Sequence, residues 1–230
     1  MRNVFFLGLL ISASVSVISC SNSASDPDNR SAQEAFDSLS VAGDTVTQHA
    51  TTFSTAIHQL TNDLNQIPLT GNADRDFAII LKSHHQGAVD LAQAELNTGK
   101  DAALKKIAQR ISSIQKSEIN ALEHFVDSIK KGSLTVRYNR KDDKSGFGKV
   151  IKTHKTMMWD MSKMDTNMVA DQQFVAVMIP HLQSAVYLAE GFLKYGKDPW
   201  LIQKANEIIP RKKKQIEELK VWANSNKGTP

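Results

Sequence analysis

Apolar residues recur at steps of three and four along most of this chain, the spacing that places side chains on one face of an α-helix. The pattern predicts helices over residues 74–96, from 101 to the glycine at 132, over 149–168 and 171–193, and from 198 toward 222. An earlier stripe comprises Val46, His49, Phe53, Ile57, Leu60, Leu64 and Ile67. The sequence has no convincing period-two strand pattern, so we predict an all-α protein.

The helical pattern occurs twice along the chain. His84 recurs as His181, an offset of 97 residues, and Phe77 recurs as Phe174 at the same offset. With no gap, residues 74–122 and 171–219 agree at 18 of 49 positions. This duplication predicts two tandem three-helix repeats, packed as one bundle around a pseudo-twofold axis. Each copy then serves as a control for the other.

The N-terminus has the features of an export signal. Arg2 supplies a positive charge, and residues 4–11 form an apolar stretch too short to span a bilayer comfortably. Residues 17–20, Val-Ile-Ser-Cys, resemble a bacterial lipobox, in which the cysteine becomes acylated. The alternative is an ordinary signal peptide with a chance cysteine. We predict that acylated Cys20 inserts into membrane lipid and anchors the protein in the bacterial cell envelope, facing the periplasm or the surface.

Composition divides the chain further. We predict a lipoprotein signal peptide at 1–20, a flexible tether at 21–35, a first helical repeat at 36–131, a polar connector at 132–148 and a second helical repeat at 149–230. Cys20 is the only cysteine, so no internal disulfide can form.

Charge argues against a nucleic-acid partner. The formal net charge of +4 is mild, and aromatic residues make up only 7% of the chain, which disfavours a base-stacking surface. The single basic run, residues 211–214, predicts a solvated helix face, with contact to anionic lipid as the alternative.

His84 and His181 are the first candidates for chemistry. Each shares a helical stripe with apolar residues, so both side chains are predicted to point into the bundle. A buried imidazole must satisfy its nitrogens with hydrogen bonds or a metal. A satisfied core histidine and a metal ligand are both open readings. His85 is a weaker candidate, because the second copy has Leu182 in its place.

Several carboxamides and one carboxylate accompany these histidines. Glu118 lies on the apolar stripe of its helix and needs a donor, which His84 or His85 could supply. Its counterpart is Gln215, so the pair predicts a structural polar lock. Two further glutamines recur in both copies and predict buried interhelical hydrogen bonds: Gln86 and Gln183.

Methionine is concentrated in one region. His154 and the methionines at 157, 161, 164 and 168 step at helical spacing. Thioethers with imidazole form a donor set suited to Cu(I). The opposing interpretation is core packing, because the counterparts of these methionines are ordinary core residues such as Leu60 and Leu64. The candidate metal ligands are His84, His85, His154, His181, Met157, Met158, Met161 and Met178.

The motifs resemble a known family. Asp74, Phe77 and residues 84–89 (HHQGAV), with residues 178–181 (MIPH) in the second copy, are similar to the domain of unknown function 305 family. The resemblance covers most of residues 74–222. It implies a ferritin-like helical bundle that is secreted or lipid-anchored. It also implies copper binding or heavy-metal tolerance for some members and no assigned activity for most.

This chain departs from the family pattern at four positions. The first copy has Leu81 and Ser83 where the family often has methionine and proline, and the second has Leu182 and Gln215 in place of a histidine and the glutamate. A family metal site that needs all of these residues is complete in neither copy.

These observations predict a non-catalytic protein. The sequence contains no nucleophile elbow, P-loop, glycine-rich dinucleotide turn or Glu-x-x-His pair. We therefore expect an envelope lipoprotein that binds copper or another soft metal through histidine and methionine. The alternative is a structural or protein-interaction module of the envelope, whose buried His, Glu and Gln side chains hold no metal.

Overall fold

The computed structural model describes residues 52–129, 138–164 and 168–226. These residues form six helices and no strand: α2 (Phe53–Gln66), α3 (Ala73–Thr98), α4 (Ala102–Ile129), α5 (Gly146–Met161), α6 (Ala170–Phe192) and α7 (Pro199–Ser225). The predicted all-α fold is confirmed. The predicted signal peptide, Cys20 and the tether lie outside the described residues.

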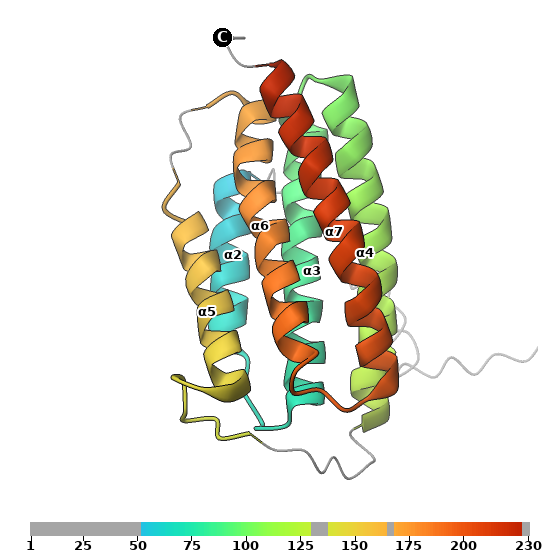
Figure 1. The fold of residues 1–230 in the computed structure, drawn as a ribbon. Coiled ribbons are helices and arrows are strands. Elements are labelled where there is room, and N and C mark those ends of the chain that lie inside the picture. The colour runs from blue at the N-terminus through green and yellow to red at the C-terminus, as the bar shows by residue number, and fades with distance from the viewer. Residues whose placement is uncertain (1–51, 130–137, 165–167, 227–230) are drawn as a thin grey trace, which may run out of the picture. The chain divides into compact units, whose positions relative to one another are not determined.

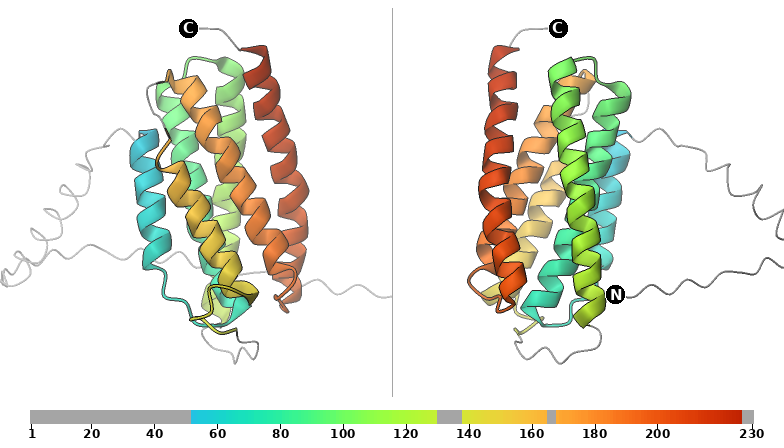
Figure 2. Two further views of the ribbon diagram at one scale, coloured as in Figure 1. Left: turned by 60° about the vertical axis from the view of Figure 1, so that its left-hand side comes forward. Right: turned by 90° about the vertical axis from the view of Figure 1, so that its right-hand side faces the viewer.

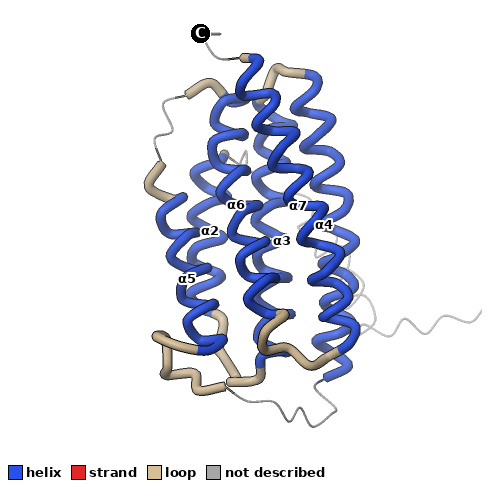
Figure 3. The backbone as a smooth tube through the Cα atoms, in the orientation of Figure 1, coloured by secondary structure: helices blue, strands red, loops and turns tan. Residues whose placement is uncertain are grey.

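The helices form two layers of three (Figure 1). Helices α2, α3 and α4 make one layer, and α5, α6 and α7 make the other. Figure 2 shows the same two layers from the sides, and Figure 3 shows the connections at the helix ends. Helices α3 and α6 occupy the middle of their layers and contact each other, so their facing sides are the best shielded part of the bundle.

The buried positions repeat with the sequence. In the outer helices, Phe53, Ile57 and Leu64 of α2 are buried, and so are Val150 and His154 at the equivalent places of α5. The same offset relates the buried residues of α3 to those of α6 and those of α4 to those of α7. Each sequence repeat is therefore one three-helix layer.

Two aspartates link the layers reciprocally. Asp74, in the first turn of α3, accepts hydrogen bonds from the backbone N–H groups of Lys197 and Asp198, at 2.8 and 3.0 Å. Asp171 accepts from the N–H groups of Lys100 and Asp101, both at 2.9 Å. Each helix start thus holds the connection that follows the other central helix. The two matching sets of hydrogen bonds are related by the pseudo-twofold axis that the repeat predicts.

Some helix ends differ from the sequence-based expectation. The N-cap of α3 is Asn72, whose side chain accepts from the N–H of Arg75. Helix α5 begins at Gly146, which has a φ of +58° that favours glycine, and it ends at Met161. Met164 and Met168 therefore lie beyond the helix that their spacing predicted.

The helical part has a core of its own. The buried apolar residues begin at Phe53 and end at Leu219, inside a compact unit that spans Gln48–Pro230. None of the described helices is long and apolar enough to cross a membrane.

Candidate metal centre

Three histidines from three helices meet between the layers. His84 comes from α3, His154 from α5 and His181 from α6, and all three are 0% exposed. The Nδ1 atom of His84 lies 3.1 Å from the Nε2 atom of His154. The rings of His84 and His181 stack with their centroids 3.9 Å apart and an interplanar angle of 14°. The repeat-related pair thus meets directly, as its inward phase predicted.

Burial keeps these imidazoles neutral. It lowers the pKa of His154 to about 3, and the nearby Lys155 contributes. It also holds the pKa values of His84 and His181 well below the usual value, and neighbouring imidazoles add to the effect. Among the described residues, the Nε2 atom of His84 and the Nδ1 atom of His154 have no hydrogen-bond partner. Neutral imidazole with a free nitrogen is the form that binds metal ions.

Met158 brings sulfur to the same region. It is fully buried on α5, and its Sδ atom lies 3.6 Å from the Oγ atom of Ser184. That hydroxyl also donates to the backbone carbonyl of His181 at 2.7 Å. Met158 is therefore linked through Ser184 to the backbone of His181, one of the two stacked histidines.

The other candidate methionines belong to the apolar core. Met161 and Met178 are buried in it, and Met157 packs against it from a partly buried position. Their counterparts Leu64 and Leu81 are core residues as well, so packing accounts for these side chains.

His85 points elsewhere, into an ion-pair network between α3, α4 and α7. Its Nε2 atom lies 3.1 Å from the Oε2 atom of Glu118, which also pairs with Arg211. Burial lowers the pKa of His85 to about 4, although Glu118 opposes the shift. Burial alone would raise the pKa of Glu118, but His85 and the cations Lys212 and Arg211 hold it below its usual value. The predicted partnership of Glu118 with an adjacent histidine is present.

Lys212 is the polar residue that the sequence reasoning missed. Its side chain is fully buried, its Nζ atom has no hydrogen-bond partner among the described residues, and burial lowers its pKa to about 7. The prediction of a solvated face for residues 211–214 is therefore wrong at this position. Two signals could have revealed it: Lys212 shares a helical phase with Ile208 and Leu219, and its repeat counterpart is the buried Gln115.

The glutamines divide into two groups. Gln215, the counterpart of Glu118, is buried as predicted. Gln86 and Gln183 are exposed, so their predicted burial is wrong. The Nε2 atom of Gln86 donates to Asp90 within α3 at 2.9 Å. Two residues along a helix turn the side chain by about 200°, which takes Gln86 to the far side from His84.

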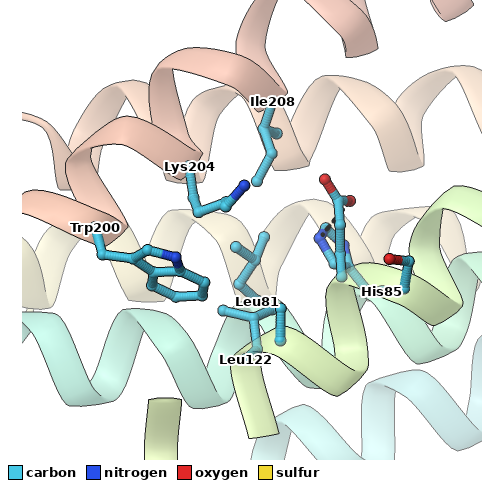
Figure 4. Close-up of a pocket in the computed structure, with 9 residues that line it drawn as sticks. Leu81, His85, Leu122, Trp200, Lys204 and Ile208 are labelled. Carbon is cyan, nitrogen blue, oxygen red and sulfur yellow. Dashed lines mark ion pairs between the residues drawn. The ribbon is translucent and has the colours of Figure 1, made fainter. Parts of the chain in front are cut away.

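A small cavity reaches this network (Figure 4). It has a volume of about 80 Å³ and lies between α3, α4 and α7. Its lining residues are Leu81, His85, Ser117, Glu118, Ala121, Leu122, Trp200, Lys204 and Ile208. The indole of Trp200 and the ammonium of Lys204 border it on α7, and His85 lies at its α3 side. The buried polar layer is thus adjoined by space large enough for a few water molecules.

The sequence profile described as "Domain of unknown function (DUF305)" matches residues 30–126 and 74–223. The chain belongs to the DUF305 family. No curated protein matches its sequence.

Solved structures of CopM have a similar fold to this DUF305 chain. CopM in the apo form matches with a TM-score of 0.50 and 24% sequence identity, over 66% of this chain and 96% of CopM. CopM in the Cu(II)-bound form gives the same values. At this level of identity the likeness shows the fold alone.

The described residues of this DUF305 chain offer some of the ligands that a metal ion needs, but not a complete set. The described residues contain no group of three or more His, Cys, Asp or Glu side chains arranged to hold a metal ion. The Nδ1 atom of His84 and the Nε2 atom of His154 lie 3.1 Å apart, however, and the thioether of Met158 is linked through Ser184 to the backbone of His181. A bound metal would therefore be held by His84 and His154, and completing its ligand sphere would need Met158 or a turn of the His181 ring.

Proposed function

We propose that this protein is a non-catalytic metal-binding lipoprotein of the bacterial cell envelope, with copper as its metal. His84 and His154 are the primary ligands, and Met158 and His181 complete the site. The observation that carries the proposal is the 3.1 Å separation between the Nδ1 atom of His84 and the Nε2 atom of His154, both on neutral and fully buried imidazoles.

The geometric argument concerns the two ring nitrogens that face each other, Nδ1 of His84 and Nε2 of His154. Two nitrogens 3.1 Å apart can both lie at about 2 Å from one ion, which is an ordinary metal–imidazole distance. No net loss of a proton is needed, because burial already keeps His154 neutral at physiological pH, but the proton between the two facing nitrogens has to move to the other nitrogen of its ring.

Ligand chemistry favours copper within the metal class. Imidazole accepts several transition metals, whereas thioether sulfur selects soft ions such as Cu(I). CopM, which shares the fold, has been solved in a Cu(II)-bound form.

The second candidate is a structural module without metal. It is favoured by the contacts of Glu118, which pairs with His85 on α3 and with Arg211 on α7. A network of this kind fixes how three helices pack, whatever else the protein binds. The two candidates predict different behaviour for His85 and His154.

Copper titration of Gln48–Pro230 under reducing conditions, followed by metal analysis, separates them. We expect one Cu(I) per chain and loss of binding in His154→Ile, which installs the residue that the first repeat has at Ile57. His85→Leu, which copies Leu182, is the matched control and should retain copper. A metal content near zero, or binding unaffected by His154→Ile and by Met158→Leu, would leave the structural module as the function.

The envelope anchor has a separate test. We expect the full chain expressed in bacteria to incorporate radiolabelled palmitate and to fractionate with membranes. Cys20→Ser should abolish the label. A labelled Cys20→Ser variant would refute acylation at this cysteine without affecting the metal proposal.

A further inference from the structure

The outer faces of α2 and α5 carry different chemistry at equivalent positions. On α5, Lys149, Lys152 and Lys155 follow one another at helical spacing and lead to Trp159. The equivalent residues at the start of the repeat and along α2 include no lysine, arginine or tryptophan: Thr52, Thr55, His58 and Asn62. Because α2 and α5 form equivalent edges of the two layers, the fold itself does not require the lysines or the tryptophan.

The excess of positive charge extends along this side of the second repeat. Residues 140–163 contain seven Lys or Arg residues against three Asp residues, whereas residues 53–66 contain no Lys or Arg. Two of the aspartates form ion pairs there, Asp143 with Lys152 and Asp160 with Lys163. All four of these side chains are strongly exposed, so the pairs contribute little. The face keeps a net positive potential.

Trp159 is the exposed aromatic residue of this face. It is 52% exposed, and the ammonium of Lys163 lies 5.2 Å from its ring centroid. Beside it is a hollow of about 360 Å³ between α5 and the α2–α3 connection. Leu69 and Ile151 contribute apolar lining. Arg140, Lys152 and Lys155 contribute three cations against one carboxylate, Asp143. An amphipathic ring next to cations is the arrangement that settles at the headgroup level of a bilayer.

We propose that the outer face of α5, with the adjoining connector, docks on an anionic phospholipid surface. Lys149, Lys152 and Lys155 bind lipid phosphates, and the Trp159 ring enters the headgroup region. A membrane fits better than a nucleic acid, because base stacking needs several aromatic residues along a groove and this face offers one. The proposal is independent of copper binding.

Vesicle co-sedimentation of Gln48–Pro230, which lacks Cys20, tests the docking. We expect binding at low salt to vesicles of phosphatidylglycerol and phosphatidylcholine in equal parts, and none to phosphatidylcholine alone. Changing Lys149, Lys152 and Lys155 together to Gln should lower the partition coefficient by about a hundredfold, since each lysine near an anionic surface contributes roughly fivefold. Brominated phosphatidylglycerol should quench the fluorescence of Trp159, and Trp159→Phe should remove that quenching.

The exposed lysines of α7 provide the matched control. Lys213, Lys214 and Lys220 changed together to Gln remove the same charge from another face and should leave binding nearly unchanged. An equal loss in this variant would show general electrostatic attraction and overturn the proposal. Equal binding to both vesicle types, absence of binding to either, or an unquenched Trp159 would overturn it as well. Unchanged helical circular dichroism in each variant excludes unfolding.

Discussion

The first repeat places Gln115 and Glu118 on the inner side of α4, whereas the second places Lys212 and Gln215 at the equivalent positions of α7. The backbone plan and the apolar core positions are shared, but the charges are distributed unequally. A carboxylate in one half faces a buried ammonium and a guanidinium from the other. The two copies have diverged toward complementary charges, so neither half has a balanced polar interior alone.

The histidines diverge in the same way. His84 and His181 are retained in both copies and stack on each other, while His85 and His154 occur once each, opposite Leu182 and Ile57. The shared pair lies where the layers meet. The unshared residues extend the polar layer in two directions: His85 pairs with Glu118, and His154 contacts His84 from α5. The two proposed functions therefore depend on different residues.

Removing the carboxylate should have the largest effect. Glu118→Leu leaves His85, Arg211 and Lys212 without their anion, and truncating one partner of a largely buried ion pair costs about 3 kcal/mol or more. Urea denaturation measures the loss. Glu118→Gln, which makes the first copy match Gln215, keeps the side-chain volume and should cost less. Equal stability of Glu118→Leu and the unmodified protein would mean that the charge complementarity between the halves is unimportant.

The buried lysine should give the next largest effect, as a pH dependence. Burial lowers the pKa of Lys212 to about 7 in the folded protein, from 10.5. The unfolded chain therefore binds more protons between these values, and the free energy of unfolding rises with pH in that window. Relative to Lys212→Gln, which copies Gln115, the unmodified protein should gain about 1 kcal/mol per pH unit between about pH 8 and about pH 10.

Denaturation curves across that pH range provide the measurement. Lys213→Gln, an exposed neighbour on the same helix, is the control and should run parallel to the unmodified protein. Parallel curves for Lys212→Gln as well would show that this lysine reaches solvent in the folded state.

The reciprocal aspartates should give a smaller and unequal pair of effects. Asp74→Ala removes a carboxylate that accepts two backbone N–H groups, at a cost of about 2 kcal/mol. Asp171→Ala removes the same contacts, but above about pH 8, where Glu95 is ionised, it also removes the repulsion between two carboxylates, because burial and Asp171 raise the pKa of Glu95 to about 8. We therefore expect a smaller loss for Asp171→Ala.

Thermal unfolding of both variants about one unit above the pKa of Glu95, where that carboxyl is ionised, gives the comparison. The counterpart of Glu95 is Phe192, so no such relief is available at Asp74. Adding Glu95→Gln should bring the two losses closer together. A larger loss for Asp171→Ala would contradict the inequality.

Helical periodicity and the internal repeat predict most of the fold, because both depend on spacing that the chain states directly. The inward phase of His84 and His181 follows from the same spacing. The burial of Lys212 was missed because the run of charged residues around it predicts a solvent-exposed segment. Its position relative to the apolar residues of the same helix predicts a core residue instead. The face of the helix on which a residue lies predicts whether that residue is buried. The density of charged residues predicts only the average exposure of the whole segment.

Contacts between separate helices are the part that the sequence could not provide. The 3.1 Å distance between the ring nitrogens of His84 and His154 depends on how α5 packs against α3. The helical periodicity of apolar residues in either helix does not predict that distance. The sequence predicted that Glu118 pairs with either His84 or His85, because these two adjacent residues were the donors that a neighbouring helix could offer it. Arg211 as a further partner required the crossing of α4 and α7.

Substitution of the glutamines that occur in both copies should have the smallest effect on stability. It also tests whether a polar residue that recurs in both repeats is buried. Gln86→Ala removes an exposed hydrogen bond to Asp90, and Gln183→Ala truncates an exposed side chain, so each should change the free energy of unfolding by less than about 0.5 kcal/mol. Gln215→Ala, at a buried position, should cost about 1–2 kcal/mol in the same urea assay. A loss at Gln86 or Gln183 as large as that at Gln215 would mean that these side chains have a partner within the fold. Small losses at both would mean that a residue shared by the two repeats can lie on the surface as readily as in the interior. The helix face on which a repeated polar residue lies must therefore be established before that residue is assigned to the core.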